Sequence, residues 1–543
     1  MKHWTKLFIG IGILLWAGCT DETTVYQQDE ASGPFIIEKI AEPAGAVSFA
    51  SAGVLKFFKQ TQSLSTEEET AGDYPLTLVA SITPPLREDG SLFTASHVDV
   101  DQDFAYVAYN TAGDVYEGAI DVVNISDPNN PVVSSRLVYR NADVNSVSYD
   151  SGFLYAVGSV DSETSSSAIS NSFVARIPAF GGLLQTDGIQ YGFQQGYNAT
   201  DVVTRPDRIL VSSGKEGGIV AYSKTDLAIL SELFLTDARS LASTGAGVAV
   251  LDVGSGVRIL ESDLSESSLI PISADLGENS KKTIDIWDEW VIVAEGTNGA
   301  GIYEASTGTL VQNLPIPALP EGVDAAYRVT NAVSVNENAI FMANGGAGLS
   351  LAEREGSGAT TMGVIELGGS VNYVTSQDDF AFAASGGDGL HIIKLNRPAD
   401  SLDTRYLDLP QYEGKSRLII NKEESAAYRG EKRLELIQVE GSLMLGGSWT
   451  VYNDVTVASQ GIFHISGSMA VGRNDGMKAI VVEPQAILRV SGNLTLYGDL
   501  ILKDGATVEF LDPDSVIDIF GAVKREGETS ILGTFRDVRG AFK

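Results

Sequence analysis

The sequence predicts an all-β protein that consists of a seven-bladed β-propeller followed by a small β-solenoid. Seven similar segments recur between residues 76 and 397, and a second block with a shorter period occupies residues 436–543. Glycine accounts for 57 of the 543 residues, which is typical of a chain with many tight turns between short strands. The two periods therefore divide the chain into a propeller over 76–397 and a solenoid-like module over 436–543.

Each unit of the first block has an alternating run, a short polar turn and a second run rich in Val, Ala and Tyr. The seven units align over Val98–Val107, Val147–Ala156, Val202–Val211, Leu241–Val250, Ile284–Val293, Val333–Met342 and Val374–Ala383. Their starts lie 49, 55, 39, 43, 49 and 41 residues apart. A period of this length with three or four short strands is typical of propeller blades. The nearly apolar second run indicates a strand buried on both faces.

A third strand follows in most units and usually opens with glycine. Examples are Gly218, Gly256, Gly301, Gly348 and Gly389. Glycine permits positive φ in these hairpins and close approach of neighbouring blades. Seven blades can close into a ring without free sheet edges. The closing strand is either Leu76–Ile82, ahead of the first blade, or Thr404–Leu409, after the last, and the sequence leaves both open.

The N-terminus has the form of a bacterial export signal over residues 1–18. A basic start, with Lys2 and Lys6, precedes the 12-residue apolar run Leu7–Gly18, which is too short to span a bilayer. The run ends directly before Cys19 and resembles the lipobox of bacterial lipoproteins, although Trp16 replaces the usual leucine. The resemblance implies lipidation of Cys19 and anchoring to a membrane. An ordinary signal peptide with an incidental cysteine is the alternative.

The residues after Cys19 indicate where the anchored protein faces. Thr20-Asp21-Glu22 resembles the surface-export signal of lipoproteins in the Bacteroidetes group, which implies an outer-membrane lipoprotein exposed at the cell surface. Residues 19–75 are predicted to form an acidic tether, with ten acids against three lysines over residues 20–75. Its apolar pieces, Phe35–Ile37 and Val54–Phe58, are candidates to dock on the body as extra strands.

A basic segment separates the two repeat blocks. Seven Lys or Arg residues fall between Arg405 and Arg433, and we predict that residues 398–435 are a linker that pairs with acidic neighbours. In the second block, units near 20 residues with alternating strands and turn glycines favour a right-handed β-solenoid of four or five coils. A small β-sandwich is the alternative for this module.

The clearest propeller unit carries a family resemblance. Its strand Ala105-Tyr-Val-Ala108, followed by Asn124-Ile-Ser-Asp-Pro-Asn-Asn-Pro131, resembles the LVIVD repeat, and the resemblance extends over about 320 residues, weakly in the second and third units. It implies a β-propeller in an exported, often surface-associated protein, and it supplies no catalytic residues. The WD repeat fits poorly, because Trp287-Asp288 falls in a predicted hairpin turn rather than at a strand end.

Residues that could carry chemistry are few. Cys19 is the only cysteine, so the body has no thiolate zinc site or cysteine nucleophile. The histidines of the body, which are His97, His391 and His464, lie in different units without metal-ligand spacing. His97 is the most interesting, because it precedes an inner strand near the predicted propeller funnel.

Two further groups have a functional and a structural interpretation. Asp99, Asp101 and Asp103 are spaced as in calcium loops, but no glycine or distal glutamate completes the loop, which favours a structural role. Trp287 and Trp290 either present a carbohydrate-stacking face or belong to a blade core. We therefore predict no catalytic, cofactor-binding or metal-binding residue.

The charge and the fold together predict the class of function. Asp and Glu outnumber Lys and Arg by 71 to 37, a net charge of −34, which repels nucleic acid. We expect a non-catalytic, surface-tethered binding or scaffold protein whose propeller engages a protein or a glycan. The alternative is an extracellular enzyme acting on polysaccharide or peptide, which requires acids, Arg or His from several blades to converge in the funnel.

Overall fold

The computed structural model describes residues 35–58, 71–396 and 405–543, except residues 112, 114, 164, 166, 278–280, 319–321, 338, 357 and 475–477. The predicted export signal, Cys19 and the acidic residues after it lie outside the described residues. Strands dominate this part of the chain, and helical structure is confined to short turns such as the 3-10 turn η1 (Ala325–Tyr327) among the described residues. In the described ranges, no helix has the length and hydropathy needed to cross a membrane.

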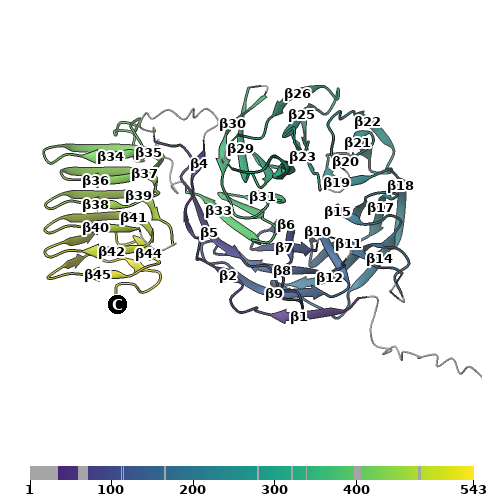
Figure 1. The fold of residues 1–543 in the computed structure, drawn as a ribbon, viewed down its shortest axis with the longest axis horizontal. Coiled ribbons are helices and arrows are strands. Elements are labelled where there is room, and N and C mark those ends of the chain that lie inside the picture. Colours follow the sequence, from purple (N-terminus) through teal and green to yellow (C-terminus); the bar gives the residue numbers. More distant parts are fainter. Residues whose placement is uncertain are drawn as a thin grey trace, which may run out of the picture. The chain divides into compact units, whose positions relative to one another are not determined.

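Residues 76–395 form seven antiparallel sheets, which are the blades of the propeller (Figure 1). Six blades take their four main strands from one stretch of the chain, and the seventh takes its fourth strand from the segment ahead of blade 1. Blade 1 contains β6 (Thr94–Asp101), β7 (Phe104–Asn110), β8 (Gly118–Asn124) and β9 (Val132–Tyr139). Blade 2 contains β10 (Ala142–Asp150), β11 (Phe153–Val160), β12 (Ser172–Phe180) and β14 (Gln190–Gln194), and β13 (Leu183–Leu184) also pairs with β12. Blade 3 contains β15 (Ala199–Thr204), β16 (Arg208–Ser213), β17 (Gly218–Ser223) and β18 (Ile229–Phe234).

The remaining four sheets repeat this arrangement. Blade 4 contains β19 (Ala238–Ser243), β20 (Gly247–Asp252), β21 (Gly256–Glu261) and β22 (Glu266–Ile270). Blade 5 contains β23 (Ile284–Trp287), β24 (Trp290–Ala294), β25 (Ala300–Glu304) and β26 (Leu310–Leu314). Blade 6 contains β27 (Arg328–Val335), β28 (Ala339–Gly345), β29 (Leu349–Glu355) and β30 (Gly358–Ile365). Blade 7 contains β31 (Tyr373–Gln377), β32 (Phe380–Ala384), β33 (Leu390–Leu395) and β5 (Leu76–Ile82).

The first strands of the blades contact one another around a closed ring, in the order β6, β10, β15, β19, β23, β27, β31 and back to β6. The second strands are nearly all buried, and β24 is buried at every residue. Hydrophobic clusters span neighbouring blades; one of them joins Phe382 and Ile392 of blade 7 to Val107 and Tyr109 of blade 1. Burial on both faces explains why the second run of each repeat is apolar. The prediction of a seven-bladed propeller is confirmed.

The segment ahead of the first blade closes the ring. β5 pairs antiparallel with β33, with Leu76 opposite Leu395 and Ile82 opposite Leu390. Of the rival segment, the described residues 405–409 form no strand. The glycine that opens the third strand of blade 7 is required here, because Gly389 has a φ of +82° and an added Cβ would lie 1.9 Å from the Ile82 carbonyl oxygen.

The described part of the predicted tether adds strands to the outer edges of three blades. β1 (Ile37–Ala41) pairs with β9 of blade 1, and β2 (Val47–Ser48) and β3 (Gly53–Val54) pair with β5 of blade 7. β4 (Phe57–Phe58) then pairs with β30 of blade 6. Residues 37–58 therefore cover the edges of blades 1, 7 and 6 in turn, and the two apolar pieces of the tether do dock on the body. Covered edges are protected from pairing with other chains.

The C-terminal module is a β-solenoid of parallel strands. One sheet contains β34 (Arg417–Ile420), β36 (Leu436–Val439), β38 (Val455–Val457), β40 (Ala479–Val482), β42 (Asp499–Leu502) and β45 (Val523–Arg525). The other contains β35 (Ser425–Leu434), β37 (Ser442–Val451), β39 (Ile462–Gly472), β41 (Ile487–Tyr497), β43 (Thr507–Phe510) and β46 (Ser530–Leu532), with β44 (Val516–Ile519) and β47 (Arg536–Asp537) beside them. The solenoid is confirmed and the alternative of a sandwich is wrong, because every one of these strand pairs is parallel.

Two details of the solenoid differ from the expectation. It has six coils rather than four or five, because six strands stack in its first sheet. Its first coil, β34 and β35, lies inside the predicted linker 398–435, ahead of the expected start at 436. The basic residues of this coil obscure the alternation of apolar and polar residues in its sequence, which is why the coil was assigned to the linker. One of them pairs with an acid as predicted, since Lys432 Nζ lies 2.7 Å from Asp73 Oδ1.

Candidate functional site

A large polar cavity lies where the first strands of the seven blades converge. It has a volume of about 830 Å³ and is lined by residues from every blade. Amides dominate the lining, which includes Asn110, Asn145, Asn198, Asn331 and Asn372. A cavity of this size with a few convergent polar groups is typical of a site for a small ligand. We call it the funnel.

Equivalent positions of the seven repeats build the funnel. Each aligned run of the seven repeats starts with an apolar residue, which is Val98 in blade 1. Two residues before this start, the blades carry, in order, Ser96, Asn145, Thr200, Arg239, Lys282, Asn331 and Asn372. Six of these seven side chains line the cavity. Lys282 is the exception, being only 2% exposed, and its neighbour Lys281 takes its place in the lining. A position that is polar in all seven blades is thus the signature of the funnel.

Most side chains of this position hydrogen-bond the next blade. The donors and their carbonyl acceptors are Ser96 Oγ to Val144 (3.1 Å), Asn145 Nδ2 to Ala199 (3.0 Å), Thr200 Oγ1 to Ala238 (2.8 Å), Asn331 Nδ2 to Val371 (3.4 Å) and Asn372 Nδ2 to Ala95 (3.1 Å). In all five pairs the acceptor lies three residues before the first aligned apolar residue of the next blade. These bonds fix the polar side chains in place, and they join blade 7 to blade 1.

Aspartates of blades 1, 3 and 5 form a second set of contacts between blades. Asp99, Asp201 and Asp285 accept hydrogen bonds from the backbone N–H groups of Tyr149, Leu241 and Val335, at 2.7, 3.0 and 2.9 Å. Burial raises the pKa of Asp99 and of Asp285 to about 6, although these N–H donors oppose the shift. The acids therefore hold neighbouring inner strands in register, a role that is structural.

Lys281 is the central cation of the funnel. Its Nζ lies 3.0 Å from the Asn145 carbonyl oxygen and 3.3 Å from that of Ser96, and 5.0 Å from the centre of the Tyr373 ring. The lysine precedes blade 5, whereas these partners belong to blades 1, 2 and 7, so its side chain reaches across the funnel. Burial lowers the pKa of Lys281 to about 8, and the distant Asp201 carboxylate partly offsets this.

The other buried cation of the lining is neutralised. Arg239 holds Asp237 through Nε at 3.2 Å and Nη2 at 2.7 Å, and both side chains are buried. Lys215 and Glu216 are adjacent, exposed residues at the rim. Lys281, by contrast, has no carboxylate within salt-bridge distance among the described residues, where its partners are two carbonyl oxygens and the ring of Tyr373. Among the described residues of the lining, Lys281 is therefore a buried cation without a carboxylate in direct contact, in a protein with a net charge of −34.

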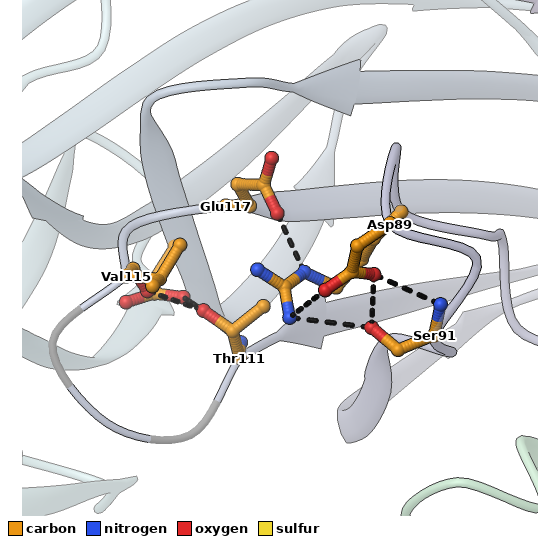
Figure 2. A network of polar contacts seen from close by, with 7 residues as sticks. Asp89, Ser91, Thr111, Val115 and Glu117 are labelled. Atoms are coloured by element: carbon orange, nitrogen blue, oxygen red, sulfur yellow. Dashed lines mark hydrogen bonds and ion pairs between the residues drawn. The ribbon is translucent and has the colours of Figure 1, made fainter.

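A polar network joins two connections of blade 1, and Figure 2 shows it from close by. Arg87 Nε lies 2.6 Å from Glu117 Oε2, and Arg87 Nη1 lies 3.2 Å from Ser91 Oγ. Thr111 N donates to Asp143 Oδ1 in blade 2 at 2.9 Å, and Thr111 Oγ1 lies within hydrogen-bond distance of the Val115 carbonyl oxygen and of the same carboxylate. The network ties the connections β5–β6 and β7–β8 together beside the strand ends that carry Ser96 and Asn110.

The histidines singled out in the sequence lie apart from one another. His97 is buried in β6 outside the cavity lining, where Nδ1 accepts a hydrogen bond from Val147 N (3.4 Å) and the ring packs 4.0 Å from Tyr373. His391 is buried in β33, with Nδ1 2.9 Å from Ser81 Oγ. His464 lies in the solenoid, 2.9 Å from Ser491 Oγ. Among the described residues, no three His, Cys, Asp or Glu side chains form a group that could hold a metal.

The tryptophan pair belongs to a blade core. Trp287 and Trp290 are 5% and 4% exposed and meet edge to face, 5.8 Å apart, in a cluster with Ile292 and Met342. Arg354 covers the Trp290 ring at 4.3 Å. The hypothesis of a carbohydrate-stacking face at these residues is therefore wrong. The exposed aromatic ring at the funnel is Tyr197, 59% exposed, which the sequence analysis did not single out.

Fold and site together define a seven-bladed β-propeller protein with a polar central funnel and an appended solenoid. No family model and no curated protein matches the chain. Among solved structures, the WD40 β-propeller domain of Doa1 is similar, with 12% identity, 60% of this chain and 98% of that chain covered, and a TM-score of 0.43. The structure of U3-55K is similar at 12% identity, 57% and 97% coverage, and a TM-score of 0.44. The number of blades and their closure follow from the strand pairing described above.

Proposed function

We propose that the protein is a lipid-anchored, surface-exposed binding lipoprotein of the LVIVD type whose propeller funnel takes up a ligand. The observation that carries the proposal is the funnel itself, in which all seven blades supply polar groups to one cavity of about 830 Å³. The hydrogen bonds between blades hold these groups in fixed positions, so that a ligand meets a preorganised surface. The lipobox-like Cys19 and the following acids support the tether.

The amide-rich lining favours binding over catalysis. The alternative of an extracellular enzyme requires ionisable groups from several blades to meet at reactive distance. In the funnel, Arg239 and Asp237 are held in a mutual ion pair. Outside its lining, His97 and Asp99 are engaged in contacts between blades. The amides Asn110, Asn145, Asn198, Asn331 and Asn372 bind and orient polar ligands, but they do not act as acids or bases at neutral pH.

A ligand screen tests the proposal. The soluble fragment 20–543 is applied to a glycan array and to a pull-down of cell-surface proteins, next to the variant Asn198→Ala, which alters the funnel at its half-buried rim. We expect a ligand that binds the native fragment and binds the variant at least several-fold more weakly. A ligand that binds both equally would place the binding surface elsewhere on the molecule and refute the proposal for the funnel.

A further inference from the structure

The chemistry of the funnel specifies the class of its ligand. We propose, on the basis of the binding function above, that the funnel recognises a saccharide bearing a carboxylate, with the carboxylate at Lys281 and the sugar hydroxyls on the surrounding amides. Three independent features point to this ligand. They are the Lys281 ammonium group, which has no carboxylate in contact among the described residues, the hydrogen-bonding capacity of the amides and the exposed ring of Tyr197.

The cation selects for one negative charge. An ammonium group has three N–H donors, and the Lys281 Nζ has two carbonyl oxygens, those of Ser96 and Asn145, within 3.3 Å. Among the described residues, no protein acceptor is in contact with the third donor, which can therefore serve a ligand in the funnel. Because Arg239 is engaged by Asp237 and by the Gly277 carbonyl oxygen, a single carboxylate matches the ammonium group of Lys281, whereas the further charges of a polyanion would meet the carboxylates of Asp237 and Glu216.

The amides match hydroxyl groups. Asn110 Nδ2 donates to Asn145 Oδ1 at 2.8 Å, and Asn145 Nδ2 donates to Asn198 Oδ1 and to the Ala199 carbonyl oxygen. This chain of three amides leaves the Oδ1 of Asn110 and the Nδ2 of Asn198 without a recorded partner in the described part of the chain. One is an acceptor and the other a donor. A sugar hydroxyl both donates and accepts, so that neighbouring hydroxyls can bind the two groups together.

The aromatic ring and the size of the cavity favour a saccharide over a protein. Tyr197 lines the cavity on the β14–β15 connection and is 59% exposed. An exposed ring at the edge of a polar cavity offers an apolar face for the C–H face of a sugar and a hydroxyl for its polar edge. A cavity of about 830 Å³ falls within the range of small-molecule sites, whereas a specific protein partner covers a broad surface of about 800 Å² on each side.

Matched acidic and neutral saccharides test the proposal. Oligosaccharides of galacturonate, guluronate, mannuronate and glucuronate, each next to its carboxyl-reduced counterpart, are titrated calorimetrically into the fragment 20–543. We expect at least one acidic member to bind about tenfold more tightly than its reduced counterpart, the size of effect expected for one charge-assisted hydrogen bond. Lys281→Met should abolish this preference. Lys215→Met, which removes an exposed rim charge, should change the affinity by less than about threefold.

Tyr197→Ala serves as a second variant, because this exposed side chain can be removed without disturbing the core. It should weaken the binding of acidic and of carboxyl-reduced saccharides alike. Equal binding of acidic and reduced forms, or no binding of any acidic saccharide, would overturn the acidic-saccharide inference and leave the funnel as a site for another ligand. Acidic binding that Lys281→Met, Tyr197→Ala and Asn198→Ala all leave unchanged would overturn the inference and the proposed funnel function together.

Discussion

Asp201 is the single side chain whose removal should most weaken the contact between inner strands. Its Oδ1 accepts hydrogen bonds from Ser146 Oγ (2.8 Å) and Val202 N (3.0 Å). Its Oδ2 accepts from Ser240 Oγ and Leu241 N, both at 3.0 Å. One carboxylate in blade 3 therefore holds blades 2 and 4. Asp201→Ala leaves two buried backbone N–H groups without an acceptor, at about 1–3 kcal/mol each.

The expected loss of stability is therefore about 2–6 kcal/mol for Asp201→Ala. For Asp201→Asn it is about 1–3 kcal/mol, because the amide keeps one acceptor oxygen. Urea unfolding of the fragment 20–543 measures the stability, and hydrogen exchange at the amide of Leu241 reports the lost bond locally. Asp207→Asn is the control, since this aspartate of the same blade has an exposed side chain. If Asp201→Ala has the same stability and the same exchange rate at Leu241 as the control, the role assigned to the carboxylate is refuted.

Three further predictions concern ring closure, the funnel and the anchor. Gly389→Ala should destabilise the protein by at least about 1–3 kcal/mol in urea unfolding, because of its positive φ and the contact with β5, whereas Gly387→Ala, with open space around it, should be neutral. Affinity for an acidic saccharide should fall as the pH rises through about 8, because Lys281 then loses its proton, and Lys281→Met should remove this dependence in a calorimetric pH series. Cys19→Ala should release the protein from the membrane fraction, and retention of the variant there would contradict lipid anchoring.

The pH prediction depends on the groups that surround Lys281. Tyr373 on β31 and the carbonyl oxygens of β6 and β10 face its ammonium group. At longer range, the Asp201 carboxylate raises the pKa of Lys281, and the charge of Lys281 lowers the pKa of His97. Burial, reinforced by the charge of Lys281, keeps the pKa of His97 well below its usual value, so this ring stays neutral between pH 7 and 9. Burial likewise raises the pKa of Tyr373 well above its usual value. Burial also lowers the pKa of Lys282 to about 8, and its Nζ lies 3.3 Å from Asn331 Oδ1. Two lysines therefore titrate in this range, and Lys281→Met identifies the part that belongs to Lys281.

The fold was predictable because it repeats. Seven apolar second runs and the glycines of the third strands are local signals, and each of them specifies one blade. The closing strand was not predictable, because Leu76–Ile82 pairs with β33 more than 300 residues away. The first solenoid coil was missed because its strands carry basic residues, such as Arg417 and Arg429, on exposed or half-buried faces.

The candidate site was predictable only in part. The position that lines the funnel holds Ser, Asn, Thr, Arg, Lys, Asn and Asn in the seven blades, so residue identity does not reveal it, whereas hydrogen-bonding capacity at an aligned position does. Lys281 could not have been found this way. Its partners, Ser96, Asn145 and Tyr373, come from three other blades, and they meet only when the ring is closed.

A crystal structure of the fragment 20–543 with a bound uronate oligosaccharide tests the central claim most directly. The account predicts density in the funnel, with the carboxylate at hydrogen-bond distance from Lys281 Nζ and hydroxyls on the amides of Asn110 and Asn198. Density for the saccharide on the solenoid or on the outer strands of the blades, with the funnel filled by water alone, would contradict it.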